Sequence, residues 1–375
     1  MTTLQKSVWG VLIVLALGAI FIMTAPKQGD EIQLGFIGPL SGDAATYGET
    51  EKNATELALK EINTARKQKI IIVYEDGRCT AKDGLTAAQK LLGTVRPQVI
   101  LGGTCSAETL AIAPVTERAK VILFSDFSSN PQITNAGDYV FRNAPSDSEI
   151  ARTDAEKMLT DGRTRIALLS EETDYSIGVR DVMRTIFAKR GVSPMFDETY
   201  ASTLATNDFR TILLKIKAAE PDAVYINTGT SAKTAGLLAK QAKEVGITAQ
   251  LYSNFQVGTS DGLAAGGKAL EGIIYSDAAP LTGKGKEVLE KYKAAYGKEP
   301  GFEYAMTAAY DRMYIIAQAI DAVGYDAGKI KAYLYRMPDF AGATGTYHFD
   351  GNGDVVGIGF VNRVIKNGKG EVLRP

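Results

Sequence analysis

Residues 99–131 decide the fold class, and they read VILGGTCSAETLAIAPVTERAKVILFSDFSSNP. Two apolar segments, 99–101 and 121–124, flank a helical segment, which is the pattern of a strand–helix–strand unit. In a parallel sheet built from such units, ligands bind at the carboxyl ends of the strands, beside the N-termini of helices. Two loops of this stretch follow the carboxyl ends of strands. The stretch therefore predicts a ligand-binding site at this edge of the sheet as well as the fold class.

The two loops carry groups that suit a small polar ligand. Gly102 and Gly103 are expected to let a ligand approach the backbone, and Ser106 stands where a helix N-cap is expected. Free N–H groups at such a helix start favour an anion. The second loop, residues 125–129, is rich in hydroxyls. An ordinary strand–helix–strand unit with a normal N-cap is the alternative interpretation.

Strand and helix patterns repeat on both sides of this stretch. The spacing of Thr46 and Glu49 predicts a capping box at the start of the first helix. A final β region is expected over 345–373. Further strands are predicted at 32–36, 70–74, 139–142, 165–169, 195–200, 223–227, 250–253 and 272–276. Such an array predicts an α/β protein with parallel, doubly wound sheets in two lobes.

Length and charge narrow the class of protein. The chain has 375 residues, with 42 basic and 43 acidic side chains. This length corresponds to about two domains. The near-neutral charge argues against a nucleic-acid-binding protein, which normally has a basic patch. We therefore expect no nucleic-acid partner.

The N-terminal segment, residues 1–30, is separate from the fold. Lys6 is followed by twenty uncharged residues, 7–26, which as a helix would span roughly 30 Å, the thickness of a bilayer core. The positive start predicts that the bulk of the protein lies outside the cytoplasm. Residues 23–25, Met-Thr-Ala, make a poor cleavage site, so an uncleaved membrane anchor is favoured over a cleaved signal peptide. A buried core helix is the third interpretation.

Cys79 and Cys105 are the only cysteines. Two cysteines in an exported chain favour one disulfide. Each follows an apolar strand, and neighbouring strands would bring the two together. Two free buried thiols are the alternative.

The chain resembles the branched-chain amino-acid-binding (leucine/isoleucine/valine-binding type) periplasmic binding proteins of ABC transporters, from about residue 32 to 367. The resemblance is carried by the order and spacing of 32–42 (IQLGFIGPLSG), 102–106 (GGTCS), 113–116 (APVT) and 340–354 (FAGATGTYHFDGNGD). It implies two Rossmann-like lobes joined by three crossings, with 32–142 and 277–337 in lobe 1 and 143–276 and 338–375 in lobe 2. It also implies a disulfide between Cys79 and Cys105.

The resemblance assigns ligand-binding roles to particular residues. It implies that Ser106 and nearby N–H groups hold a ligand carboxylate, that the Phe127 carbonyl and Ser129 hold an amine, and that Tyr47 and Tyr175 line the cleft. A carboxylate at a helix N-terminus gains charge-assisted hydrogen bonds.

The chain departs from this family at two positions in lobe 2. An acidic residue that usually faces the ligand ammonium is absent from residues 252–256 (YSNFQ), and an aromatic position near Asn227 is lost. Either one of the acids Asp126, Glu171 and Asp174 replaces the missing one, or the ligand is an amide, a carboxylate or another small polar molecule. Asn227, Asn254 and Phe255 are then expected to contact it.

Other motifs point to no catalytic or metal chemistry. His348 is the only histidine, so a Ser-His-Asp triad would have to use it, and a zinc site would have only one histidine ligand. Residues 262–269 (GLAAGGKA) nearly match a phosphate-binding loop, but Ala269 replaces its hydroxyl. Residues 350–354 (DGNGD) resemble the start of a calcium loop, whose sixth and twelfth positions fail here, and a hairpin turn is favoured.

These observations predict a non-enzymatic, extracytoplasmic solute-binding protein with no cofactor and no metal. It is expected to be anchored by its N-terminal helix, or secreted if that helix is cleaved, and to close on a small ligand for ABC permease subunits. A membrane-tethered sensor without a transport role is the alternative function.

Overall fold

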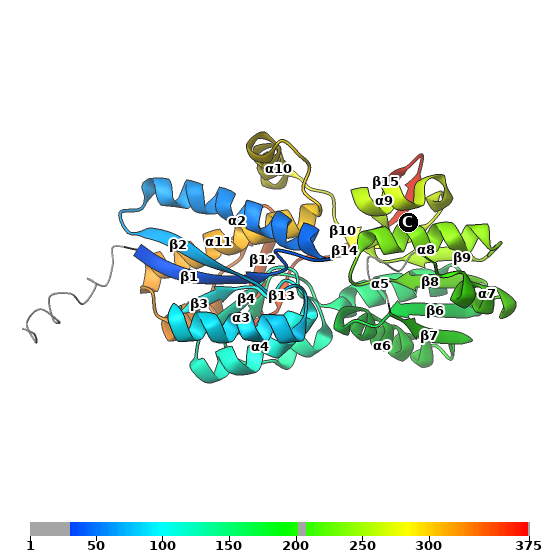
Figure 1. Cartoon of the computed structure of the whole chain (residues 1–375), viewed down its shortest axis with the longest axis horizontal. Helices are drawn as coiled ribbons and strands as arrows, with labels where there is room; N and C mark the ends of the chain where they lie inside the picture. Colours follow the sequence, from blue (N-terminus) through cyan, green and yellow to red (C-terminus); the bar gives the residue numbers. More distant parts are fainter. Residues whose placement is uncertain (1–30, 202–207, 374–375) are drawn as a thin grey trace, which may run out of the picture.

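Two α/β lobes lie side by side in the computed structural model (Figure 1). The structure describes residues 31–201 and 208–373. The predicted N-terminal anchor, residues 1–30, lies outside the described residues. Within the described part of the chain, no helix is both long and apolar enough to cross a membrane.

Lobe 1 is built on a five-stranded parallel sheet of order β2-β1-β3-β4-β5. Apolar side chains alternate between its two faces, so each face has its own core of fully buried residues. The strands are β1 (Glu31–Gly38), β2 (Lys69–Asp76), β3 (Val99–Leu101), β4 (Ile122–Ser125) and β5 (Val140–Arg142). The helices are α2 (Ala45–Ala65), α3 (Ala81–Thr94), α4 (Ser106–Ala119), α10 (Gly283–Tyr296), α11 (Glu303–Val323) and α12 (Ala327–Leu334), with the short η1 (Pro131–Asn135).

Lobe 2 contains a seven-stranded sheet of order β15-β14-β10-β9-β8-β6-β7, antiparallel only at β14 and β15. Its strands are β6 (Ile166–Glu171), β7 (Phe196–Tyr200), β8 (Ala223–Asn227), β9 (Gln250–Ser253), β10 (Ile274–Ala278), β14 (Phe360–Lys366) and β15 (Lys369–Val372). Its helices are α5 (Asp147–Thr160), α6 (Asp174–Lys189), α7 (Arg210–Ala218), α8 (Ala232–Glu244), η2 (Phe255–Gly258), α9 (Ser260–Gly266) and η3 (Gly267–Leu270). The predicted two-lobed α/β fold is confirmed.

The chain crosses between the lobes three times, after β5, after β10 and after the hairpin that precedes β14. The last crossing differs from the expected boundary at residue 338. β11 (Phe340–Ala341), β12 (Thr346–Phe349) and β13 (Val355–Val356) form a small separate sheet, and Phe340, Tyr347 and Phe349 pack into the core of lobe 1. Burial of these rings therefore draws residues 340–356 into lobe 1 and leaves β14 and β15 to lobe 2.

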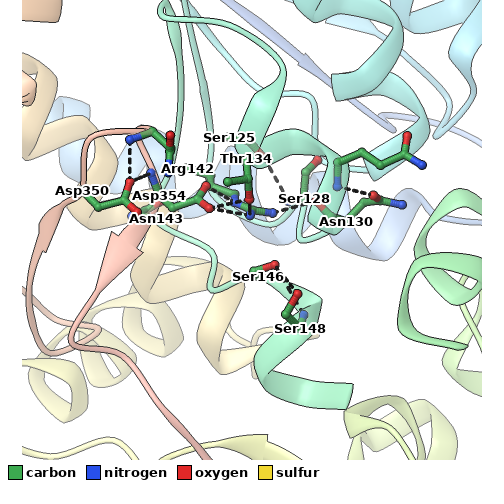
Figure 2. Close-up of polar contacts among 12 residues, drawn as sticks. Ser125, Ser128, Asn130, Thr134, Arg142, Asn143, Ser146, Ser148, Asp350 and Asp354 are labelled. Carbon is green, nitrogen blue, oxygen red and sulfur yellow. Dashed lines mark hydrogen bonds and ion pairs between the residues drawn. The ribbon is translucent and has the colours of Figure 1, made fainter. Parts of the chain in front are cut away.

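Arg142 fastens this hairpin to the last strand of the lobe 1 sheet (Figure 2). Its Nε and Nη2 donate to the two carboxylate oxygens of Asp354 at 2.6 and 2.9 Å, and its Nη1 donates to the carbonyl of Asn130 at 2.9 Å. The Arg142 side chain is fully buried. A two-pronged pair of this kind fixes orientation as well as distance, so two of the crossings are held together at their lobe 1 ends.

Two local predictions about helix starts are wrong. Helix α2 begins at Ala45 without a side-chain cap, so Thr46 and Glu49 form no capping box. The capping box belongs to α4, where Cys105 is the N-cap, Glu108 is the reciprocal partner, and Ser106 is the first helical residue. The disulfide at Cys105 and the burial of Glu108 place the cap one residue earlier than the hydroxyl pattern indicates.

Candidate functional site

A cavity of about 1170 Å³ lies between the lobes and is lined by both. Six of the eight residues predicted to bind ligand line this cavity: Tyr47, Ser106, Phe127, Ser129, Tyr175 and Phe255. They come from α2, α4, the loop after β4, α6 and η2, which lie far apart in the sequence. The tertiary structure therefore brings most of the predicted site together.

The start of α4 forms one end of the cavity. Ser106 and Ala107 line it, and as first-turn residues their N–H groups have no acceptor within the helix. The Ser106 hydroxyl accepts a hydrogen bond from the Asn130 N–H at 3.2 Å, which leaves its own O–H available to a ligand. Unpaired N–H groups and a hydroxyl at a helix N-terminus suit a carboxylate.

The predicted disulfide joins Cys79 to Cys105, with 5.2 Å between their Cα atoms. Behind it, the buried Glu108 carboxylate accepts the N–H groups of both cysteines, at 2.9 and 3.0 Å. Burial raises the pKa of Glu108 to about 7, and these backbone hydrogen bonds oppose the shift. The disulfide and Glu108 together fix the loop from which α4 starts.

Gly102 and Gly103 serve packing and do not line the cavity, contrary to the expectation that they expose backbone to a ligand. A Cβ on Gly102 would lie 2.1 Å from the carbonyl oxygen of Ile37, and one on Gly103 would lie 2.6 Å from the Glu108 Cβ. Only glycine permits this close approach of the loop to β1 and α4.

The three serine hydroxyls of the loop after β4 have different surroundings. The Ser125 and Ser128 hydroxyls both donate to the carbonyl of Gly103, at 2.7 and 2.8 Å, and so join the two loops. Ser129 is the serine of this loop that lines the cavity. The loop thus places the Ser129 hydroxyl at the cavity, while the Ser125 and Ser128 hydroxyls connect it to the neighbouring loop.

A buried charged group lies under this loop. Arg312 Nη1 lies 2.7 Å from Asp126 Oδ1, and both side chains are fully buried. Glu51 lies beside them, where it accepts the Thr104 hydroxyl at 2.8 Å. Burial, and then the charge of Asp126, raise the pKa of Glu51 well above its usual range, against the opposing effect of Arg312. Asp126 is therefore committed to Arg312 and does not face a ligand.

Aromatic rings from both lobes form the apolar wall of the cavity. The Tyr47 ring centre lies 4.5 Å from that of Phe302 and 5.3 Å from that of Phe127. Phe255, from lobe 2, lies 5.9 Å from Phe127 and 6.4 Å from Tyr175. Sequence reasoning missed Phe302, because a lone aromatic before α11 has no motif around it. The rings suit an apolar ligand body.

Two hydrogen bonds join the lobes at the edges of this wall. Gln256 Nε2 donates to the Tyr47 hydroxyl at 2.8 Å, and Asn130 Nδ2 donates to the Asp174 carbonyl at 2.5 Å. Neither Gln256 nor Asn130 was singled out from the sequence, since their roles depend on a residue of the other lobe. The structure is therefore that of a closed pair of lobes.

Asn227 and Asn254 are fully buried and do not line the cavity. Asn227 Nδ2 donates to the carbonyl of Ser176 at 2.7 Å, and Asn254 Nδ2 donates to the carbonyl of Thr228 at 2.7 Å. Both amides therefore support the lobe 2 wall from behind. Their polarity suggested ligand contact, but burial within lobe 2 already supplies them with partners.

The two acids of lobe 2 that were candidates for a ligand contact, Glu171 and Asp174, are engaged or exposed. Glu171 Oε2 accepts the N–H groups of Gly229 and Thr230 at 2.6 and 2.9 Å. Asp174 is an exposed residue of the cavity rim. Phe255 lies in residues 252–256, which contain no acid.

The other sequence motifs lie away from the cavity chemistry. His348 is on β12, where Nδ1 lies 2.9 Å from Asp339. Residues 350–354 form a turn in which Asp350 accepts backbone N–H groups. Residues 262–269 belong to α9 and η3, after no strand. In the described ranges, no group of three His, Cys, Asp or Glu side chains is placed to hold a metal ion.

Comparison with known proteins agrees with this architecture. A family model described as "Periplasmic binding protein" matches residues 31–368. An "Amino acid binding protein" of Pseudomonas aeruginosa is 27% identical over 82% of this chain and 83% of its own length. A "Leucine-, isoleucine-, valine-, threonine-, and alanine-binding protein" of the same organism is 25% identical over 88% and 89%.

A solved structure gives the same fold. The crystal structure of a leucine-binding protein from Thermotoga maritima superposes with a TM-score of 0.81 at 25% identity, covering 92% of this chain and 98% of that one. The similarity therefore spans both lobes and all three crossings.

Proposed function

This chain belongs to the periplasmic binding protein family, and we propose that it captures a small amino acid with an apolar side chain for an ABC importer. The similar proteins are solute-binding proteins, and this chain is a binding protein rather than an enzyme. The proposed ligand class is supported by relatives whose names specify leucine and other aliphatic amino acids.

The interlobe cavity is the observation that carries the proposal. One end offers the Ser106 hydroxyl and the unpaired N–H groups at the start of α4, which suit a carboxylate. The wall offers the rings of Phe127, Phe255 and Phe302, which suit an aliphatic side chain. A molecule that has both groups gains hydrogen bonds and apolar burial at once.

Closure of the lobes is the proposed mechanism. Lobe 1 captures the ligand first through α4 and Ser129, because these carry the polar groups of the cavity. Lobe 2 then closes with Tyr175 and Phe255, and the contact between Gln256 and Tyr47 stabilises the closed state. The closed state is the one proposed to be presented to a permease.

The proposed place of action is outside the cytoplasm, in keeping with the family. Tethering through the N-terminal segment stays a prediction, since residues 1–30 lie outside the described part of the chain. Comparison of the membrane and soluble fractions of cells expressing the full chain tests it. Recovery of the intact protein in the soluble fraction alone would contradict an anchor.

A thermal-shift screen tests the ligand class. The fragment from Asp30 onward would be heated with aliphatic amino acids, their amides, small carboxylates and ureas. A ligand that binds only the folded state stabilises it by mass action, by about 2.7 kcal/mol when its concentration is a hundred times the Kd. This gain in the free energy of unfolding raises the melting temperature. We expect aliphatic amino acids to give the largest shifts. Shifts confined to amides or ureas would contradict the proposal.

A further inference from the structure

Asn130 of lobe 1 forms a contact with α6 of lobe 2. It follows Ser129 in the loop after β4 and is the N-cap of η1. Its side-chain Nδ2 donates to the carbonyl of Asp174, the first residue of α6, at 2.5 Å. Asn130 is only 3% exposed, so its end of this hydrogen bond between the lobes is shielded from water.

Lobe 1 holds Asn130 through its other polar groups. The Asn130 N–H donates to the Ser106 hydroxyl at 3.2 Å, and Oδ1 accepts the N–H of Gln132 at 2.8 Å. The Asn130 carbonyl accepts a hydrogen bond from Arg142 Nη1 at 2.9 Å (Figure 2). These three bonds lie within lobe 1 and fix the orientation in which Nδ2 meets lobe 2.

Ser106 connects this contact to the ligand end of the cavity. Its hydroxyl accepts the Asn130 N–H and can donate its own proton to a ligand carboxylate. Hydrogen bonds in a chain polarise one another, so a carboxylate that accepts the Ser106 proton strengthens the bond from Asn130. A bound ligand therefore stabilises Asn130 in the position from which its side chain contacts α6.

Gly178 lies on α6, one turn after Asp174, and faces Asn130 across the interface between the lobes. A Cβ at this position would lie 2.9 Å from Asn130 Nδ2, 3.3 Å from Asn130 Cγ and 3.0 Å from Pro131 Cδ. The three atoms nearest to such a Cβ all belong to lobe 1. A side chain at position 178 would therefore collide with lobe 1 in the closed state.

The atoms of lobe 1 at this interface cannot easily move aside. The Asn130 side chain is bonded at both Oδ1 and Nδ2, and the Pro131 ring is closed on its own backbone. Helix α6 itself would accept alanine at position 178, because alanine has a higher helix propensity than glycine. Closure of the lobes, and not the folding of α6, therefore requires glycine here.

We propose that Asn130 couples a carboxylate bound at Ser106 to the closure of lobe 2, and that Gly178 provides the space this closure needs. Asn130 contacts Ser106 through its backbone and α6 through its side chain. Both Asn130 and Gly178 are positioning residues, since neither lines the cavity. This inference rests on the proposed function, because it requires a ligand carboxylate at the start of α4.

Gly178→Ala separates closure from folding. Isothermal titration is expected to give a Kd for L-leucine at least about tenfold above that of wild type, because the added Cβ overpacks the closed interface. The melting temperature without ligand should be no lower than that of wild type, because the separated lobes leave the Cβ in open space. X-ray scattering at saturating L-leucine should show a larger radius of gyration for the variant than for wild type.

Asn130→Ala tests the coupling between the two residues. Alanine at position 130 removes Cγ and Nδ2, which are two of the three atoms that a Cβ at position 178 would meet. By itself it should raise the Kd about threefold to tenfold, since one hydrogen bond between the lobes is lost. With Gly178→Ala it should raise the Kd by less than the product of the two single effects.

Gly93→Ala is the matched control. Gly93 is also a helical glycine, near the end of α3 in lobe 1, and a Cβ there would meet no atom within 4 Å. This variant should leave the Kd and the scattering of the liganded protein unchanged. If Gly178→Ala lowers the melting temperature, Asn130→Asp replaces it in the titration. That variant keeps the acceptor for the Gln132 N–H but has no donor for the Asp174 carbonyl, so the same rise in Kd is expected.

The contrary outcomes can be told apart. If Gly178→Ala, or Asn130→Asp in its place, binds L-leucine as wild type does, the inference is overturned and the proposed function still stands. Single effects on Kd that simply multiply in the double variant would overturn the coupling between Asn130 and Gly178. If the wild type binds no aliphatic amino acid, the proposed function fails, and the inference fails with it.

Discussion

The position of Ser106 at the end of the cavity is set by its neighbours. The Cys105 cap places Ser106 in the first turn of α4, and the Asn130 N–H occupies one of its lone pairs. The hydroxyl proton and the backbone N–H then both face the cavity end. At the N-cap position, one residue earlier, a serine oxygen would accept a hydrogen bond from a first-turn N–H of the helix.

Removal of this hydroxyl should weaken ligand binding without unfolding the protein. Ser106→Ala is expected to raise the Kd for L-leucine about tenfold, since a hydrogen bond to a charged group contributes about 1.5–3 kcal/mol. Ser106→Ala with Ser129→Ala should have a larger effect. Isothermal titration measures it, with the exposed Ser193→Ala as the control. An unchanged Kd in the double variant would contradict the assigned pocket.

At the scale of elements, the disulfide and α4 act as one unit. Cys79 follows β2 and Cys105 follows β3, with a sequence separation of 26 residues. These strands are not neighbours, contrary to the prediction from the sequence pattern, because β1 lies between them, and the bond joins the two loops over the end of β1. Glu108 accepts an N–H group from each cysteine. The start of α4, and with it the anion-binding end of the cavity, is therefore fixed by a covalent bond and a buried carboxylate.

Loss of the disulfide should destabilise lobe 1. The double variant Cys79→Ala, Cys105→Ala is expected to lose about 3 kcal/mol of stability, because the unfolded chain regains the entropy of an open loop. Differential scanning calorimetry should show a melting temperature lower by about 5 °C. Reductant should lower the melting temperature of the wild type and leave the variant unchanged. Equal melting temperatures of variant and wild type would contradict a stabilising disulfide.

Asp154 connects α5 to the lobe 2 sheet and should make stability depend on pH. Burial raises the pKa of Asp154 to about 7, against hydrogen bonds from the hydroxyls of Tyr225 and Ser276. The folded state therefore holds a proton that the unfolded state releases near pH 4. The contribution of Asp154 to stability is full below pH 4 and is lost as the pH rises through 7.

Asp154→Asn should reduce this loss, because an amide oxygen still accepts hydrogen bonds but has no proton to release. Between pH 5 and pH 8 the wild type is expected to lose up to about 2.5 kcal/mol more than the variant. Urea unfolding at the two pH values measures the difference. Equal losses in both proteins would show that Asp154 does not titrate in this range.

At the scale of the whole molecule, few polar contacts hold the lobes closed. Gln256 reaches the Tyr47 hydroxyl, and Asn130 reaches the start of α6, while the rings between them pack loosely enough to leave the cavity. Each lobe has its own apolar cores. One small apolar cluster, with Tyr47 and Phe302 from lobe 1 and Ala232 from lobe 2, spans the two lobes. Opening separates this cluster and leaves the cores of the lobes intact, so closure can follow ligand binding.

Tyr47→Phe should weaken ligand binding while it preserves the ring cluster. The variant loses the hydroxyl that Gln256 contacts, so the Kd for L-leucine is expected to rise about two- to tenfold, in keeping with about 0.5–1.5 kcal/mol for one hydrogen bond. Titration gives the Kd, and X-ray scattering with saturating ligand reports closure. Tyr333→Phe, in α12 of lobe 1, is the control. An unchanged Kd would indicate that this contact does not stabilise the closed state.

The sequence by itself determined the fold class, the disulfide partners and a part of the cavity lining. Alternating apolar strands and helices are local patterns, and loops at the carboxyl ends of parallel strands must share one edge. These two rules place Ser106, Phe127 and Ser129 together without any knowledge of distances.

Only the tertiary structure decided which polar residues line the cavity. Asn227 and Asn254 are as polar as Ser129, but their side-chain amides donate to backbone carbonyls of their own lobe. Gln256 and Asn130 find their partners in the opposite lobe. Residues 340–356 joined lobe 1 because their rings fit its core. Burial and hydrogen-bond pairing depend on residues far apart in the sequence, so local sequence patterns do not predict them.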